Sequence, residues 1–168
     1  MKWTEGLIHV AMRFIVSSNG WVLIAGEYPG GSDHDLYPLN VVDPVIARDR
    51  SPDPRRHSLG ELIPDLVALR GRELLIAEAK VRYDERDREK LADLVTVHQE
   101  RLRRALKTFG RERGFPQLDP VETLVLRPTL VFSSNSKAPP PSPGMSYLII
   151  NSVDNGVFEG ALRPGDDK

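Results

Sequence analysis

The sequence predicts a single α/β domain, residues 1–168, in which helices flank a mixed β-sheet. Three observations support this fold class. An apolar stripe at helical spacing lies near the N-terminus, two short apolar runs surround a glycine turn further along, and a second helical stripe precedes more strand-like runs. An antiparallel pair joined through a crossover helix to later strands implies a mixed sheet covered on both faces.

The first predicted helix begins after Thr4, a good N-cap residue, and ends near residues 17–20. Its apolar stripe consists of Leu7, Ile8, Ala11, Met12 and Ile15. Residues 21–25 then read as a buried strand. A long excursion rich in Gly, Pro and Asp follows at about residues 27–59, with short strands expected at 39–42 and 45–47.

In the second half, Asp84 is placed to cap a helix that Gly110 or Gly114 ends. The apolar positions of this helix are Leu91, Leu94, Val95, His98, Leu102, Ala105, Leu106 and Phe109. Residues 121–126 and 129–132 have strand character that Pro128 interrupts. After a proline-rich loop at about residues 137–144, residues 146–150 form the last expected strand.

Composition limits the classes of function. Hydrophobic residues make up 40% and charged residues 28%, the formal net charge is -1, and there is no cysteine. Disulfides, thiolate zinc sites and cysteine nucleophiles are therefore excluded, and any nucleic-acid surface has to be a local patch. No apolar run approaches the length of a membrane span, so we expect no membrane partner and a cytoplasmic protein.

The hairpin around Gly71-Arg72 carries the chemistry. A two-residue turn there pairs Arg70 with Glu73, and counting outward sets Asp65 opposite Glu78. Opposed residues have Cβ atoms about 4.5 to 5.5 Å apart. Glu78 and Lys80 share one side of their strand, so two acids and an amine converge. Opposed carboxylates repel unless a cation lies between them, which favours a divalent metal.

These residues resemble the motif of the PD-(D/E)xK nuclease superfamily: Pro64-Asp65, then Glu78-Ala79-Lys80 at the end of the next strand. The surrounding sequence is similar to the archaeal Holliday-junction-resolvase branch, over about two thirds of the chain by element order. The resemblance implies an αβββαβ restriction-endonuclease-like core. It also implies that Asp65, Glu78 and the backbone carbonyl of Ala79 bind Mg²⁺ or Mn²⁺, and that Lys80 holds the attacking water or the scissile phosphate.

Three further residues are open to alternative interpretations. Glu5, in the first helix, corresponds to a metal-linked glutamate in many members of the family, or it simply complements the helix dipole. His98 is more typical of a hydrogen-bonded core histidine than of a ligand. Gln99 is followed by Arg103 where the helicase-linked exonuclease branch carries tyrosine, which argues against that branch.

Basic residues suggest where nucleic acid would bind. Arg48, Arg50, Arg55 and Arg56 lie in the excursion shortly before Asp65, and we expect them to contact phosphates. The basic segment 101–113 is better explained as a solvated helix end. Residues 33–35, Asp-His-Asp, are more typical of a polar loop than of a metal site.

The expected function is a metal-dependent DNA endonuclease that cleaves a phosphodiester by in-line attack of metal-activated water and, by resemblance, leaves a 5′ phosphate. The main alternative is a catalytically inactive nucleic-acid-binding or assembly subunit with the same fold, and a third is an unrelated α/β protein. DNA is the expected partner. A homodimer and a larger DNA-processing or defence assembly are the protein partnerships considered.

Overall fold

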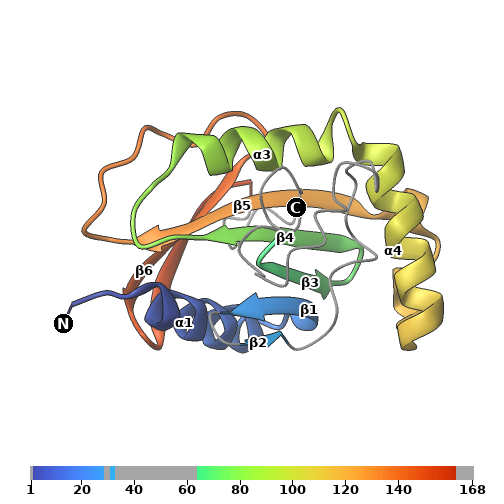
Figure 1. The fold of residues 1–168 in the computed structure, drawn as a ribbon, viewed down its shortest axis with the longest axis horizontal. Coiled ribbons are helices and arrows are strands. Elements are labelled where there is room, and N and C mark those ends of the chain that lie inside the picture. Colours follow the sequence, from blue (N-terminus) through green and yellow to red (C-terminus); the bar gives the residue numbers. More distant parts are fainter. Residues whose placement is uncertain (1, 29–30, 33–63, 162–168) are drawn as a thin grey trace, which may run out of the picture.

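A mixed β-sheet with helices on both faces forms the fold, as the sequence predicts. The computed structural model describes residues 2–28, 31–32 and 64–161. Within them the sheet has seven strands in the order β2-β1-β3-β4-β5-β6-β7. Helix α1 covers one face, and helices α3 and α4 lie on the other side (Figure 1). The described residues contain no helix that is both long enough and apolar enough to span a membrane.

Helix α1 (Glu5–Ser18) confirms the expected N-terminal helix. Its first turn is capped by the Thr4 hydroxyl, which accepts a hydrogen bond from the Leu7 N–H at 3.2 Å. Ile8, Met12 and Ile15 are buried against the sheet, as the helical stripe requires. The cap and the stripe together fix where α1 begins and which face it buries.

Strand β1 (Val22–Tyr28) continues three residues beyond the expected strand and pairs with the two-residue strand β2 (Gly31–Ser32). Residues 27–28 and 31–32 were predicted to belong to the excursion, so its beginning was placed too early. The short strands expected at 39–42 and 45–47 lie outside the described residues.

Strands β3 (Leu66–Arg70) and β4 (Glu73–Ala79) form the predicted hairpin. Their antiparallel register runs from Arg70 opposite Glu73 to Leu66 opposite Ala77, as counted from the turn. Gly71 has φ 58, and no residue other than glycine has positive φ in the described chain, which agrees with glycine at the first central position. The turn therefore sets the register that the site depends on.

The predicted second helix is two helices, α3 (Glu85–Val95) and α4 (Gln99–Arg113). Asp84 caps α3 through Arg86 N–H, and Gly114, with φ 76, ends α4 as expected. The break lies at residues 96–98, where the Thr96 hydroxyl donates to the Ala92 carbonyl at 2.6 Å. Such a side-chain bond to the backbone competes with the helical hydrogen bonds. The spacing of apolar residues gives no indication of this competition.

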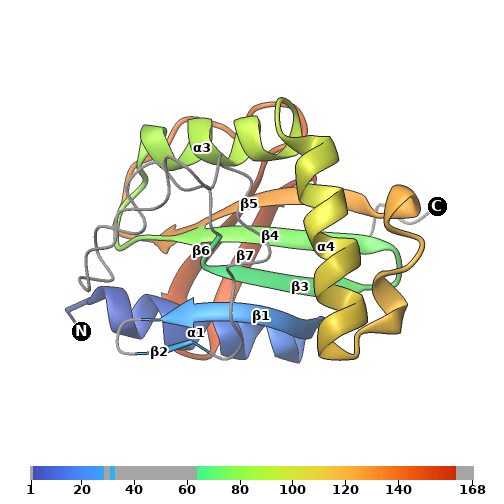
Figure 2. The same cartoon turned by 45° about the vertical axis from the view of Figure 1, so that its right-hand side comes forward.

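His98 is therefore not the core histidine that the stripe predicted. It is half-buried at the N-cap of α4, and its backbone carbonyl accepts from the Leu102 N–H at 2.9 Å. Figure 2 shows the change of direction between α3 and α4, with α4 crossing the strands near the end of the sheet where β3 turns into β4. The apolar residues of both helices still reach a common core.

Strand β5 (Val125–Ser133) is continuous, whereas two strands broken at Pro128 were predicted. Pro128 pairs with Ile76 of β4, and β6 begins to pair with β5 only at Thr129. At Pro128 the strand thus has a neighbour on one side only, where a missing N–H is tolerated. Residues 121–123, expected to be extended, form the 3₁₀ helix η3 (Val121–Thr123), which follows η2 (Pro116–Leu118).

The sheet ends in a hairpin of β6 (Ser146–Ser152) and β7 (Asn155–Gly160), the second of which was not predicted. β5 and β6 are parallel, and the expected proline-rich loop connects them without helix or strand at residues 137–144. The Tyr147 hydroxyl donates to the Pro139 carbonyl at 3.0 Å, which holds this loop on the sheet.

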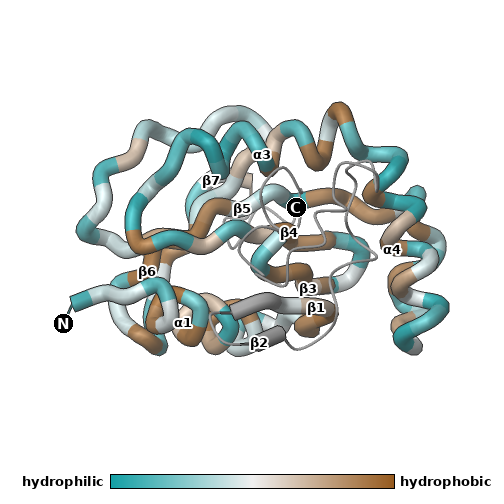
Figure 3. The backbone as a smooth tube through the Cα atoms, viewed as in Figure 1, coloured by the Kyte–Doolittle hydropathy of each residue, from teal (hydrophilic) through white to brown (hydrophobic). Residues whose placement is uncertain are grey.

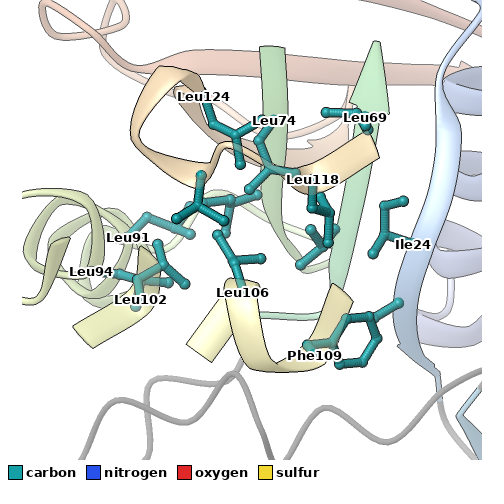
Figure 4. Close-up of a cluster of buried hydrophobic side chains, with 14 of the residues drawn as sticks. Ile24, Leu69, Leu74, Leu91, Leu94, Leu102, Leu106, Phe109, Leu118 and Leu124 are labelled. Carbon is teal, nitrogen blue, oxygen red and sulfur yellow. The ribbon is translucent and has the colours of Figure 1, made fainter. Parts of the chain in front are cut away.

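Two apolar cores, one on each face, hold the strands in place. The core beneath α1 includes Ala77 and Ala79, and the core beneath α3 and α4 includes Leu74 and Ile76. Apolar residues colour much of the central strands in Figure 3, and Figure 4 shows the α3/α4 core with leucines from β4, α3 and α4 in one cluster. Alternate residues of β4 therefore point to opposite cores.

The turn glycine gives a direct test of the hairpin. Gly71→Ala should lower the free energy of unfolding by about 1 kcal/mol, because an L-residue with positive φ is strained. Gly6→Ala is the matched control. A Cβ there would meet no atom closer than 4.0 Å, and alanine should stabilise α1 by up to about 1 kcal/mol. Urea denaturation measures the free energy of unfolding of both variants. Changes of the same sign in the two variants would contradict the turn assignment.

Candidate active site

Asp65 and Glu78 lie close together near the end of β4, and Lys80 directly follows that strand. Ala77, Ala79 and Val81 pack into the α1-side core, so Glu78 and Lys80, which alternate with them, point to the α3 side. Asp65 immediately precedes β3, the neighbour of β4. The predicted convergence of two acids and an amine is thus compatible with the observed register. The end of β4 lies on the left of the sheet in Figure 1.

Asp65 binds the backbone of β4 on both sides of Glu78. Its N–H donates to the Ala77 carbonyl at 2.9 Å, and its Oδ2 accepts from the Ala79 N–H at 2.8 Å. The ladder itself stops one pair earlier, at Leu66 and Ala77. The carboxylate therefore replaces the next backbone acceptor, and this fixes its position relative to Glu78.

Glu78 is a buried carboxylate with a cation already beside it. Its side chain is 5% exposed, and Oε1 lies 2.6 Å from Nζ of Lys90 on α3. We expected the repulsion between Asp65 and Glu78 to require a metal. The fold instead supplies an ammonium group, so the metal-free site is at least partly neutralised.

The electrostatics of this pair follow from burial and crowding. Burial raises the pKa of Glu78 well above its usual value, the negative charge of Asp65 raises it further, and Lys90 opposes both. Burial alone would lower the pKa of Lys90, but the attraction of Glu78 raises it above its usual value. Removing one member of such a pair leaves the other as an uncompensated buried charge.

Asp87, on the first turn of α3, is a third acidic residue near the site. Burial raises its pKa, and Lys80 exerts the largest opposing effect, ahead of Lys90. Its Oδ2 is buried and has no hydrogen-bond partner in the described structure. The Lys80 side chain is exposed and close enough for its charge to act on Asp87, so it can reach a substrate while remaining near that carboxylate.

Helix α1 contributes a histidine to the site. His9 is buried, and its Nε2 lies 3.9 Å from Oδ2 of Asp65. Glu5, one turn earlier, is exposed, and in the described part of the chain no hydrogen bond or ion pair joins it to Asp65 or Glu78. The predicted role of Glu5 in metal binding stays a prediction.

The predicted phosphate contacts, Arg48, Arg50, Arg55 and Arg56, lie outside the described residues, as do residues 33–35. In the basic segment of α4, Arg103 donates to the backbone carbonyls of Val121 and Leu124, at 2.5 and 3.0 Å. This role of Arg103 is structural, and the half-buried side chain departs from the solvated helix end expected for that segment. Gln99, at the start of α4, is exposed.

The donor chemistry fits a hard divalent cation. Mg²⁺ is usually bound by one or two protein carboxylates and keeps several waters. Asp65 and Glu78, with the Ala79 carbonyl, provide oxygen donors of this kind, and the unpartnered Oδ2 of Asp87 lies in the same charged cluster. Within residues 2–28, 31–32 and 64–161, however, no three His, Asp or Glu side chains are arranged as a ready-made metal cage.

No family model matches the chain, and no curated protein or solved structure matches it significantly. The functional assignment therefore depends on the geometry of the site.

Lys90, Asp87 and His9 were not predicted as site residues. Asp87 and Lys90 are spaced i, i+3 on one helix, and His9 interrupts the apolar stripe of α1. That interruption was the available signal for His9. Nothing comparable marked the other two, because a charged helix face usually points to solvent.

Two substitutions of Asp65 separate its hydrogen bond from its charge. Asp65→Ala removes the acceptor of the buried Ala79 N–H and should lower the free energy of unfolding of the metal-free protein by about 1–3 kcal/mol. Asp65→Asn retains an acceptor and removes the repulsion with Glu78, so its stability should stay within about 1 kcal/mol of wild type. If chemical denaturation shows that both variants lose the same stability, the charge of Asp65 contributes more than its hydrogen bond.

Proposed function

We propose that this protein is a metal-dependent DNA endonuclease of the PD-(D/E)xK type. The observation that carries the proposal is the meeting of Asp65 and Glu78 at the ends of adjacent strands, with Lys80 two residues further along. The order α1, β1, β3, β4, α3, β5 is also compatible with the αβββαβ core that the motif resemblance implies. Strand β2 and helix α4 are insertions within that order, and strands β6 and β7 follow it.

Asp65, Glu78 and the carbonyl of Ala79 would hold Mg²⁺ or Mn²⁺. When bound, the cation would lower the pKa of a coordinated water and neutralise charge on the phosphoryl group. The two carboxylates are held differently: Glu78 is fixed by burial on a central strand, and Asp65 by the Ala79 N–H. Such preorganisation avoids reorganising the donors during the reaction.

Lys80 would act on the substrate. Its exposed ammonium can hold the attacking water or a non-bridging oxygen of the scissile phosphate, and the nearby Asp87 carboxylate keeps a negative charge close to it. In-line attack of water on the phosphorus would break the P–O3′ bond and, by family resemblance, leave a 5′ phosphate and a 3′ hydroxyl. The expected contacts of Arg48, Arg50, Arg55 and Arg56 with DNA belong to the same proposal.

One observation favours the alternative, a DNA-binding or assembly subunit that does not cleave. Lys90 already neutralises Glu78, so the fold does not depend on a metal at this position. An inactive relative could retain the carboxylates for this structural purpose alone. Turnover in the presence of metal separates the two functions.

The decisive assay measures cleavage of branched, duplex and single-stranded DNA with Mg²⁺ and with Mn²⁺. Wild type should cleave at least one substrate only when the metal is present, and Asp65→Asn should abolish cleavage while it stays folded. Wild type that binds DNA but cleaves none of these substrates with either metal would favour the binding subunit.

Replacement of Lys80 tests its role. Lys80→Ala should reduce single-turnover cleavage at saturating DNA by about two to three orders of magnitude, because the lost charge acts mainly in the transition state. DNA affinity should barely change. Lys107→Ala, an exposed lysine on α4, is the matched control and should cleave at the wild-type rate. Weaker binding with unchanged saturated cleavage would assign Lys80 to phosphate contact instead.

A further inference from the structure

The Glu78–Lys90 pair has a consequence for metal binding. Glu78 is 5% exposed and Lys90 24%, and their charged atoms are 2.6 Å apart. Glu78 Oε1 is therefore occupied by an ammonium group in the metal-free protein. A divalent cation at Asp65 and Glu78 would place a second positive charge next to Lys90, where burial limits screening by water.

Asp87 offers an alternative partner for Lys90. It lies three residues before Lys90, so both side chains project from one face of α3. Its Oδ2 is buried yet accepts no hydrogen bond in the described structure. A buried carboxylate oxygen without a partner is uncommon, and it is explained here if Asp87 accepts a hydrogen bond in another state of the site.

We propose that Lys90 is an internal counter-ion that leaves Glu78 for Asp87 when a divalent cation binds. This inference rests on the proposed metal site at Asp65 and Glu78. Lys90 keeps the buried carboxylate compensated in the metal-free protein. Metal binding must displace the ammonium group, so Lys90 lowers the affinity for metal, and Asp87 reduces the cost of the displacement.

The first test is Mn²⁺ titration calorimetry at pH 8 on the full chain. Lys90→Met removes the competing charge and should bind Mn²⁺ at least about tenfold more tightly than wild type. Lys90→Arg retains the charge and is the control, with a dissociation constant within about threefold of wild type. If Lys90→Met does not fold, Lys90→Gln provides an uncharged side chain that can still donate to Glu78.

The second test asks whether Asp87 acts through Lys90. Asp87→Asn should weaken Mn²⁺ binding by at least about threefold more in the wild-type background than in the Lys90→Met background. An equal effect in both backgrounds would mean that Asp87 acts on the metal directly, and would overturn its role as the acceptor of Lys90.

The outcomes separate this inference from the proposed function. If Asp65→Asn abolishes Mn²⁺ binding but Lys90→Met leaves the affinity of the site unchanged, the site stands and the counter-ion role of Lys90 is overturned. If Asp65→Asn binds Mn²⁺ as wild type does, the metal lies elsewhere and the proposed function fails. If Lys90→Met binds Mn²⁺ and wild type does not, the result supports displacement of Lys90. If neither protein binds Mn²⁺, the proposed displacement is overturned.

Discussion

A carboxylate buried at the end of a central strand is the constraint around which this structure is arranged. β4 pairs with β3 on one side and β5 on the other, and Glu78 points from it into the α3 side of the sheet. An isolated ionised carboxylate there would be strongly disfavoured. Lys90 compensates its charge, and Asp65 satisfies the adjacent backbone N–H. The position of α3 is thus tied to the Glu78 side chain, and the start of β3 to the β4 backbone on either side of Glu78.

The hairpin register and the two cores make this arrangement rigid. A slip of one residue would exchange the faces of β4 and move Glu78 into the apolar core beneath α1. Gly71 and the guanidinium of Arg72 resist such a slip. Arg72 donates to Thr123 Oγ1 at 3.0 Å and to the Gln117 and Pro120 carbonyls at 2.7 Å, which fastens the turn to the segment before β5. The far end of the hairpin thus supports the geometry of the site.

Local patterns predicted the parts of the fold that local interactions determine. The Thr4 cap, the stripe of α1 and the glycine turn at Gly71 depend on residues near in sequence, and all three are confirmed. The break at residues 96–98 depends on the bond from Thr96 to Ala92, which competes with an apolar stripe that continues through it. Continuity of β5 through Pro128 depends on where a distant strand begins to pair.

The same distinction applies to the site. Asp65 and Glu78 are brought together by one short turn, so counting outward from Gly71 was sufficient to place them. Lys90 and His9 approach from helices on opposite faces of the sheet, and how each helix lies on the sheet is set by tertiary packing. For this reason the cation beside Glu78 is Lys90, whereas the sequence suggested a divalent metal and the ammonium of Lys80.

The most direct test of the central claim is a crystal structure with Mn²⁺ and anomalous diffraction data. The account predicts an anomalous peak within about 2.0–2.3 Å of carboxylate oxygens of both Asp65 and Glu78, near the Ala79 carbonyl. Lys90 Nζ should then lie beside Asp87, no longer at Glu78. A peak elsewhere, or none at high Mn²⁺ with the Glu78–Lys90 pair intact, would contradict the assignment of this site as a metal-dependent nuclease centre.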